Sequence, residues 1–254
     1  MTHVIKNVSE FKIIRESFNY INYSVGFVPT MGALHAGHLS LIEKSKEEND
    51  ITVVSIFVNP TQFNDKSDFD NYPITLTEDL QKLNNAEVDF LFLPNFKELY
   101  LDNYKYSVTE SELSNKLCGA FRPGHFDGVL TVVLKLLNIV KADYAYFGEK
   151  DYQQFLLIKG MAEAFFVDTE IISVTTVRDI DGLALSSRNV RISKENREKA
   201  THFSKYLQQG INCDKIKTML KEDGFKVDYI EIIDHRIFGA VYLDGVRLID
   251  NVKI

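Results

Sequence analysis

Apolar, β-branched runs alternate with segments of helical spacing between residues 25 and 177, and this alternation constrains the fold most. Continuous apolar strands joined by helices are typical of a parallel sheet covered on both faces. The predicted strands are Val25–Val28, Ile51–Val58, Val88–Leu93, Tyr144–Phe147 and Ile171–Val177. The predicted helices are Ser9–Tyr20, Gly37–Glu48, Leu76–Asn84, Ser111–Leu117 (stopped at Gly119), Gly128–Lys141 (capped by Asp127) and Tyr152–Ala164. We therefore expect an α/β, Rossmann-like doubly wound sheet, with ligands at the carboxyl ends of its strands.

The pattern changes after Asn189. Two helices are predicted there, at Ser193–Gln209 and Cys213–Asp223, followed by strands at Val227–Ile233, Ala240–Leu243 and Val246–Ile249. The Asp-Gly pair at 244–245 predicts a hairpin turn. We expect two domains, a nucleotide-binding domain at 1–176 and a smaller α+β domain at 177–254 that covers the active site.

Composition narrows the class of protein. The chain has 254 residues, 45% of them hydrophobic and 26% charged, with a net charge of −7. This balance argues against a broad nucleic-acid surface, which needs a basic face. The two cysteines form no disulfide framework and no Cys-x-x-Cys motif. The N-terminus opens no secretory signal, and the apolar segment Val129–Val140 is too short to span a bilayer. We expect a cytoplasmic protein.

The stretch Pro29–Ile42 joins the first strand to the helix that follows it. Backbone N–H groups at a helix start favour an anion, and Gly32 and Gly37 permit close approach to a ligand. His35 and His38 are three residues apart, so they share a face and suit hydrogen bonding to phosphate. The stretch is neither a Walker loop nor a dinucleotide fingerprint. The plainer interpretation is a strand–helix turn with two surface histidines.

Two further motifs follow predicted strands or open a helix. Asn59 and Gln62 place amides after the second strand, where they suit a polar acid with hydroxyl groups. The run 122–128, Arg-Pro-Gly-His-Phe-Asp-Gly, brings His125 to the start of the apolar helix. The alternative for the first motif is a polar turn at Pro60, and the alternative for the second is a turn followed by a helix that Asp127 caps. The stretch Asn64–Tyr72 is interpreted as a solvated loop, with a lid as the alternative.

The last two motifs supply cations and hydroxyl groups. The run 147–154, Phe-Gly-Glu-Lys-Asp-Tyr-Gln-Gln, puts Lys150 where a phosphate would be held and Gln154 one turn into a helix. The Ser-Ser-Arg element at 186–188 offers hydroxyl groups and a guanidinium to phosphate oxygens. The plainer interpretation of the first motif is a charged loop between a strand and a helix, and that of the second is a polar interdomain loop.

Together these motifs resemble a known family. The His-x-Gly-His element is similar to that of the nucleotidylyl transferase superfamily. The five motifs in their order resemble the pantoate–β-alanine ligases, over about residues 25 to 190 and again at 228–232 and 247–251. The motifs are Met31–His38, Asn59–Phe63, Arg122–Phe126, Phe147–Gln154 and Leu185–Asn189.

The resemblance implies an activity and the residues that perform it. The family joins pantoate to β-alanine with ATP, used with Mg²⁺, through pantoyl adenylate, and no protein metal ligands are expected. The implied catalytic residues are His35, His38 (as proton donor), Lys150, Ser186, Ser187 and Arg188. The implied ATP-binding residues are Met31, Gly32, Ala33, Leu34, His35, Ala36, Gly37, His38, Gly148, Glu149, Lys150, Asp151, Val177, Leu185, Ser186, Ser187 and Arg188. The implied substrate-binding residues are Gln62, Gln154, Asn59 and His125. A homodimer is also implied.

Two rival interpretations remain open. An adenylyltransferase that makes a dinucleotide shares the His-x-Gly-His element but does not need the motifs at 59–63 and 147–154. A nucleotide-binding regulatory module would have lost at least one of His35, His38, Lys150 or Arg188, and all are present. His38 is also compatible with charge stabilisation instead of proton donation. The C-terminal part looks short for the family, which puts closure of the cleft in question.

Overall fold

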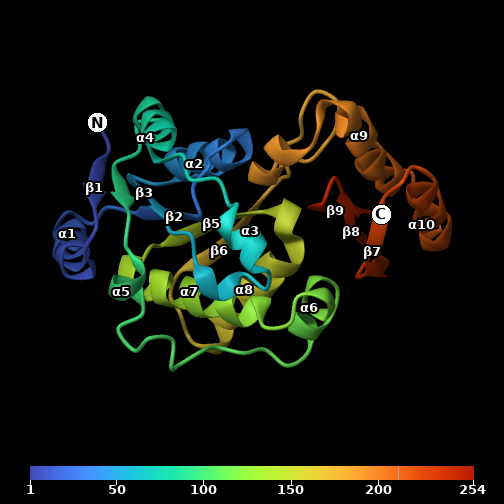
Figure 1. Ribbon diagram of the computed structural model, residues 1–254. Helices are drawn as coiled ribbons and strands as arrows, with labels where there is room; N and C mark the ends of the chain where they lie inside the picture. The colour runs from blue at the N-terminus through green and yellow to red at the C-terminus, as the bar shows by residue number, and fades with distance from the viewer. Residues whose placement is uncertain (211) are drawn as a thin grey trace.

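A six-stranded parallel sheet forms the larger part of the computed structural model, which describes residues 1–210 and 212–254, the side chains of 19–21 excepted. Its strand order is β1-β4-β3-β2-β5-β6, so the chain winds outward in both directions from β2 (Figure 1). The strands are β1 (His3–Ile5), β2 (Val25–Thr30), β3 (Ile51–Ile56), β4 (Phe90–Phe92), β5 (Tyr144–Gly148) and β6 (Glu170–Val174). The predicted doubly wound α/β sheet is confirmed. Sequence patterning missed β1, which has only three residues.

Helices cover both faces of this sheet. Adjacent residues on β2 point to opposite sides: Phe27 packs with α1, α7 and α8, whereas Val28 packs with α2 and α4. This is why the strands are apolar throughout instead of alternating. The helices of this part are α1 (Val8–Ile21), α2 (Ala36–Glu48), α3 (Lys66–Asp70), α4 (Leu76–Asn85), α5 (Phe96–Leu99), α6 (Cys118–Phe121), α7 (His125–Val140) and α8 (Tyr152–Ala164). Short 3₁₀ turns lie at η1 (Pro60–Gln62), η2 (Leu113–Asn115) and η3 (Glu149–Asp151).

Three local predictions are wrong, each for a tertiary reason. Helix α7 begins at His125, three residues early, because Gly124 caps it with a φ of 75°, so Asp127 lies inside the first turn. The stretch interpreted as a loop at 64–72 contains α3. Gly119 does not stop a helix; it lies within α6, where a Cβ atom would sit 1.6 Å from the carbonyl oxygen of Ser114.

A small antiparallel sheet follows β6. Its order is β7-β8-β9, and Asp244 and Gly245 (φ 55° and 72°) form the predicted hairpin turn between β8 and β9. Helices α9 and α10 pack beside this sheet (Figure 1). The elements are η4 (Ser187–Arg191), α9 (Lys194–Gln208), α10 (Cys213–Glu222), β7 (Lys226–Ile233), β8 (Arg236–Leu243) and β9 (Val246–Lys253).

The small sheet lies against the large part of the molecule. Tyr229, Phe238 and Ala240 belong to the same buried cluster as helices α7 and α8. A second buried cluster joins the small sheet to its own helices through residues such as Phe203 and Ile216. The small sheet is thus fixed relative to the carboxyl ends of the parallel strands. Among the described helices, none combines the length and the apolarity needed to cross a bilayer.

Candidate active site

A cavity of about 220 Å³ opens at the carboxyl ends of β2, β5 and β6. Residues from all five sequence motifs face it or support its wall. Fourteen predicted site residues line it: Met31, His35, Gly37, His38, Gln62, Gly148, Lys150, Asp151, Gln154, Val177, Leu185, Ser186, Ser187 and Arg188. Seven predicted residues do not line it: Gly32, Ala33, Leu34, Ala36, Glu149, Asn59 and His125. The edge of a doubly wound sheet is the expected place for a ligand.

The loop after β2 takes its shape from a buried carboxylate. Gly32 and Ala33 have φ values of 79° and 49°, a left-handed backbone that is strained for alanine. The carboxylate of Asp79 on α4 accepts the N–H groups of Ala33 (2.8 Å) and Leu34 (2.7 Å). Lys82 donates to the carbonyl oxygen of Leu34 at 2.6 Å. These two N–H groups are therefore not free for a phosphate.

His35 and His38 lie side by side at the end of this loop, with ring centroids 4.1 Å apart. His35 caps α2 by accepting the Gly37 N–H on Nδ1 at 3.1 Å, and Nδ1 of His38 accepts the His35 N–H at 3.4 Å. Because both Nδ1 atoms accept, a neutral ring carries its hydrogen on Nε2. A Cβ atom on Gly37 would lie 2.9 Å from His35 Cε1, so glycine permits this arrangement.

Both imidazoles are held neutral. Burial, followed by the positive charge of Lys150, lowers the pKa of His35 to about 4. Burial, followed by the neighbouring His35, lowers the pKa of His38 to about 3. Two neutral rings with Nε2–H groups can donate hydrogen bonds to an anion without adding positive charge to the site.

Gln62 is held in position by hydrogen bonds that involve three other residues. Asn59 donates to the Gln62 side-chain oxygen at 3.2 Å and to the carbonyl oxygen of Gly128 at 3.1 Å. Arg122 donates to Nε2 of His125 at 2.9 Å, so His125 Nδ1 carries the hydrogen and donates to the Gln62 carbonyl at 2.7 Å. Burial, followed by the charge of Arg122, lowers the pKa of His125 to about 3. Asn59 and His125 therefore position Gln62.

The loop after β5 brings Lys150 to the cavity. Lys150 lies 3.5 Å from Asp151, whereas Glu149 turns away toward Arg236, 3.7 Å distant. The side-chain amide of Asn251 on β9 donates to the carbonyl oxygens of Glu149 (2.8 Å) and Lys150 (3.0 Å). The small sheet thus helps to fix the cation.

The Ser-Ser-Arg element contacts the helix that the sequence did not predict. Arg188 donates to both carboxylate oxygens of Asp68 on α3, at 3.2 and 2.7 Å. The hydroxyl of Tyr72 lies 3.2 Å from Ser187 Oγ. Helix α3 therefore lies beside the cation predicted to meet phosphate.

An apolar wall of the cavity was missed by sequence reasoning. Helix α7 supplies most of it, and Phe57, Tyr146 and Phe147 add to it. The α7 residues are Val129, Val132, Val133 and Leu136. Their i, i+3, i+4, i+7 spacing was visible, but it is also the pattern of a core helix, so periodicity alone does not separate the two roles. Thr175 and Thr176, after β6, were missed as well.

The sheet, the histidine loop and the polar cavity define a Rossmann-like α/β protein with a small-molecule site at the strand ends. The family model for pantoate-beta-alanine ligase matches residues 3–253. The chain is 53% identical over 252 residues to a pantothenate synthetase of Coxiella burnetii (99% of this chain, 97% of that one). It is 50% identical over 254 residues to one of Bdellovibrio bacteriovorus, with both chains fully covered. This chain belongs to the pantoate–β-alanine ligase family of enzymes.

Solved structures agree. A Francisella tularensis pantoate-beta-alanine ligase, complexed with beta-gamma ATP and beta-alanine, has a TM-score of 0.95 at 45% identity, covering 100% of this chain and 98% of that one. A Thermus thermophilus pantothenate synthetase has a TM-score of 0.88 at 38% identity, with 99% of each chain covered. The resemblance in the motifs is confirmed. These relatives have nearly the same length as this chain, so its C-terminal part is not short in comparison with them. The expectation that it is short for the family as a whole stays a prediction.

Proposed function

We propose that this chain joins pantoate to β-alanine, with MgATP as co-substrate, through a pantoyl adenylate. One observation carries the proposal: a single cavity collects the histidine pair, Lys150, the Ser-Ser-Arg element and two glutamines. Donors and cations at one end suit a triphosphate, and amides beside an apolar wall suit a small hydroxy acid with methyl groups.

In the first step, a carboxylate oxygen of pantoate attacks the α-phosphorus of ATP. The bond from phosphorus to the bridging oxygen breaks, and pyrophosphate leaves with the electron pair. His35 and His38 donate Nε2–H hydrogen bonds, and Lys150 supplies a positive charge as negative charge develops. Because both rings are neutral, we assign His38 to charge stabilisation.

Substrate contacts follow from which residues line the cavity. Met31–His38, Gly148–Asp151, Val177 and Leu185–Arg188 are proposed to form the ATP site. Within them, Gly32–Leu34, Ala36 and Glu149 do not line the cavity and are proposed to set the shape of the loops that carry the lining residues. Gln62 and Gln154 are proposed to hold pantoate, with Asn59 and His125 as positioning residues behind Gln62.

In the second step, the neutral amine of β-alanine attacks the acyl carbon of the adenylate. The carbon–oxygen bond to the phosphate breaks, AMP leaves with the electron pair, and the nitrogen loses a proton to give pantothenate. This step depends on holding the two reactants together.

The test is isotope exchange. With MgATP and pantoate but no β-alanine, labelled pyrophosphate should enter ATP, because the first step is complete and reversible. His38→Ala and Lys150→Ala should each slow exchange by about 10²–10³-fold, the scale of removing one charge-stabilising donor. His202→Ala on α9 is the matched control and should exchange at the wild-type rate. Exchange that requires β-alanine, or ADP as the product, would contradict the adenylate mechanism.

The wider organisation is also a proposal. We propose domains at 1–176 and 177–254, because the second buried cluster draws its residues from positions 183 to 248. A homodimer through the larger domain is supported by the family resemblance and by Phe165 and Phe166, which are 55% and 91% exposed at the end of α8. A cytoplasmic location is proposed from the family to which the chain belongs.

A further inference from the structure

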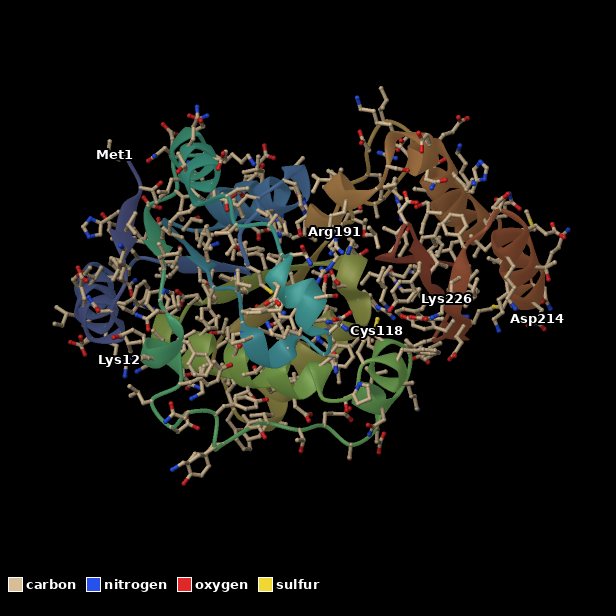
Figure 2. All side chains as sticks on the ribbon, viewed as in Figure 1. Met1, Lys12, Cys118, Arg191, Asp214 and Lys226 are labelled. Atoms are coloured by element: carbon tan, nitrogen blue, oxygen red, sulfur yellow. The ribbon has the colours of Figure 1, made fainter. Side chains whose placement is uncertain are left out.

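A second cavity of about 250 Å³ adjoins the first. The two share Lys150, Asp151, Ser186 and Arg188, so they meet at the phosphate end of the proposed ATP site. The second cavity lies between the loops of the large part and the small sheet, the region where Figure 2 labels Arg191 and Cys118. Its wall holds the arginines Arg122, Arg188, Arg191 and Arg247.

Arg122 is a cation without an acidic ion-pair partner in the part of the chain that the structure describes. It donates to His125 Nε2 and to the Gln62 carbonyl oxygen, and no carboxylate among the described residues lies within 4.0 Å of its guanidinium nitrogens. Burial lowers its pKa to about 10. Two of its nitrogens keep a second hydrogen after these bonds, and Nε keeps one. Arg122 therefore keeps N–H donors that form no hydrogen bond within the described residues, and its positive charge is not paired with a carboxylate there.

Arg247 has an unused donor in the same cavity. Its Nε donates to Asp228 at 2.9 Å, and its Nη1 lies 3.5 Å from Cys118 Sγ. Its Nη2 is buried and meets no hydrogen-bond acceptor among the described residues. A buried donor without an acceptor costs free energy, which a ligand oxygen would recover.

The other cations of the wall each have a carboxylate partner, although Arg188 and Arg191 share one. Asp68 lies 2.7 Å from Arg188 and 3.2 Å from Arg191. Asp250 lies 2.6 Å from Arg178, and Asp151 lies 3.5 Å from Lys150. Asp65 is exposed and caps α3. Arg122 is the cation of this wall that has no carboxylate within 4.0 Å among the described residues, so the carboxylate of a ligand would supply the partner that it lacks.

We propose that Arg122 and Arg247 form the subsite for the carboxylate of β-alanine. This rests on the proposed function and assigns two residues to its second step. Arg122 touches the backbone of Gln62, so a carboxylate there lies beside the residue proposed to hold pantoate. The amine of the same short molecule then reaches toward the acyl carbon. The subsite would select amino acids over simple amines.

The experiment measures each half-reaction in Arg122→Gln, Arg122→Lys and Arg247→Lys. The KM for β-alanine should rise about 10- to 100-fold in each variant, the scale of a charge-assisted hydrogen bond. Pyrophosphate exchange with pantoate alone should stay near wild type in Arg247→Lys, whose side chain does not bond to Gln62. Exchange at saturating pantoate is the reference for the Arg122 variants, because Arg122 also bonds to His125 and Gln62. Propylamine, which lacks the carboxylate, is the probe for selectivity. The wild-type preference for β-alanine over propylamine should shrink by the same factor in Arg122→Gln. Normal exchange also shows that a variant is folded.

Arg191→Gln is the matched control, because Arg191 lines the same cavity but pairs with Asp68. It should leave the preference for β-alanine over propylamine unchanged. An unchanged KM for β-alanine, together with weaker inhibition by pyrophosphate, would assign the arginines to pyrophosphate and overturn the proposal. Equal loss of preference in Arg191→Gln would overturn it too. Absence of exchange in the wild type would instead contradict the proposed function.

Discussion

At the scale of single residues, the histidine loop depends on a side chain outside the cavity. Asp79 is 1% exposed and holds two successive N–H groups of a strained turn. Lys82, one turn further along α4, holds the carbonyl oxygen of Leu34. The positions of His35 and His38 follow from this clamp, because the helix they open starts directly after it.

We predict that Asp79→Asn weakens ATP binding. The new amide NH₂ would face two N–H donors, so at least one hydrogen bond is lost and the turn shifts. The KM for ATP should rise about 10-fold, and unfolding should become easier by about 1–3 kcal/mol. Steady-state kinetics and urea unfolding measure the two effects.

Asp89→Asn serves as the control for this variant, because Asp89 also accepts a backbone N–H, that of Thr52, away from the cavity. It should lose stability without a change in KM. If both variants leave the KM for ATP unaltered, Asp79 does not position the loop.

At the scale of elements, the contact between α7 and η1 places Gln62. Gly128 lies where α7 meets η1, and a Cβ atom there would sit 2.4 Å from the carbonyl oxygen of Thr61 and 2.7 Å from the N atom of Gln62. These are backbone atoms, so the added methyl group must separate the two elements. Asn59 bonds to the Gly128 carbonyl and ties them together.

We predict that Gly128→Ala displaces η1 from α7. Overpacking of this kind costs about 1–3 kcal/mol of stability, and the KM for pantoate should rise with it. Gly160→Ala on α8 is the matched control, since a methyl group there would meet no heavy atom of a neighbouring element within 4 Å. That change should be neutral or stabilise the protein by up to about 1 kcal/mol, because alanine favours helix more than glycine does. Unaltered pantoate kinetics in Gly128→Ala would show that this contact does not place Gln62.

At the scale of the whole molecule, three neutral histidines link stability to pH. The pKa of His35 is lowered to about 4, and those of His38 and His125 to about 3. In the unfolded chain a histidine titrates near 6.5, so below that pH the unfolded state binds protons that the folded state does not. Their contribution is fully present above about pH 6.5 and is lost as pH falls toward the folded values.

We predict that the free energy of unfolding falls between about pH 6.5 and 5, by up to about 1.4 kcal/mol per pH unit for each histidine. Most carboxylates titrate near pH 4, so this window isolates the histidines. Urea unfolding at several pH values measures the slope. His125→Gln should lower the slope of the unfolding free energy against pH by the contribution of one histidine, whatever its effect on stability at neutral pH. A slope equal to that of wild type would show that His125 is not held neutral.

Local sequence determined the parallel sheet and the motifs. A strand that is buried on both faces requires a continuous apolar run, and a helix requires apolar residues spaced by 3.6 residues per turn. Both patterns can be recognised within a short stretch of sequence. The predicted segments of β3, α8 and α9 lie within one or two residues of the observed ones. The motifs follow strands because strand ends are where a ligand meets this fold.

Only the tertiary structure decided what surrounds those motifs. Asp79 lies 45 residues from Leu34 in the chain, and Asp68 lies 120 residues from Arg188. Neither contact can therefore be predicted from a local sequence pattern. From the sequence, Arg122 is interpreted as part of a turn, whereas in the structure it lines the same cavity as Arg247. Charge pairing, tautomers and cavity walls depend on side chains brought together by packing, and that information is absent from any single stretch of the chain.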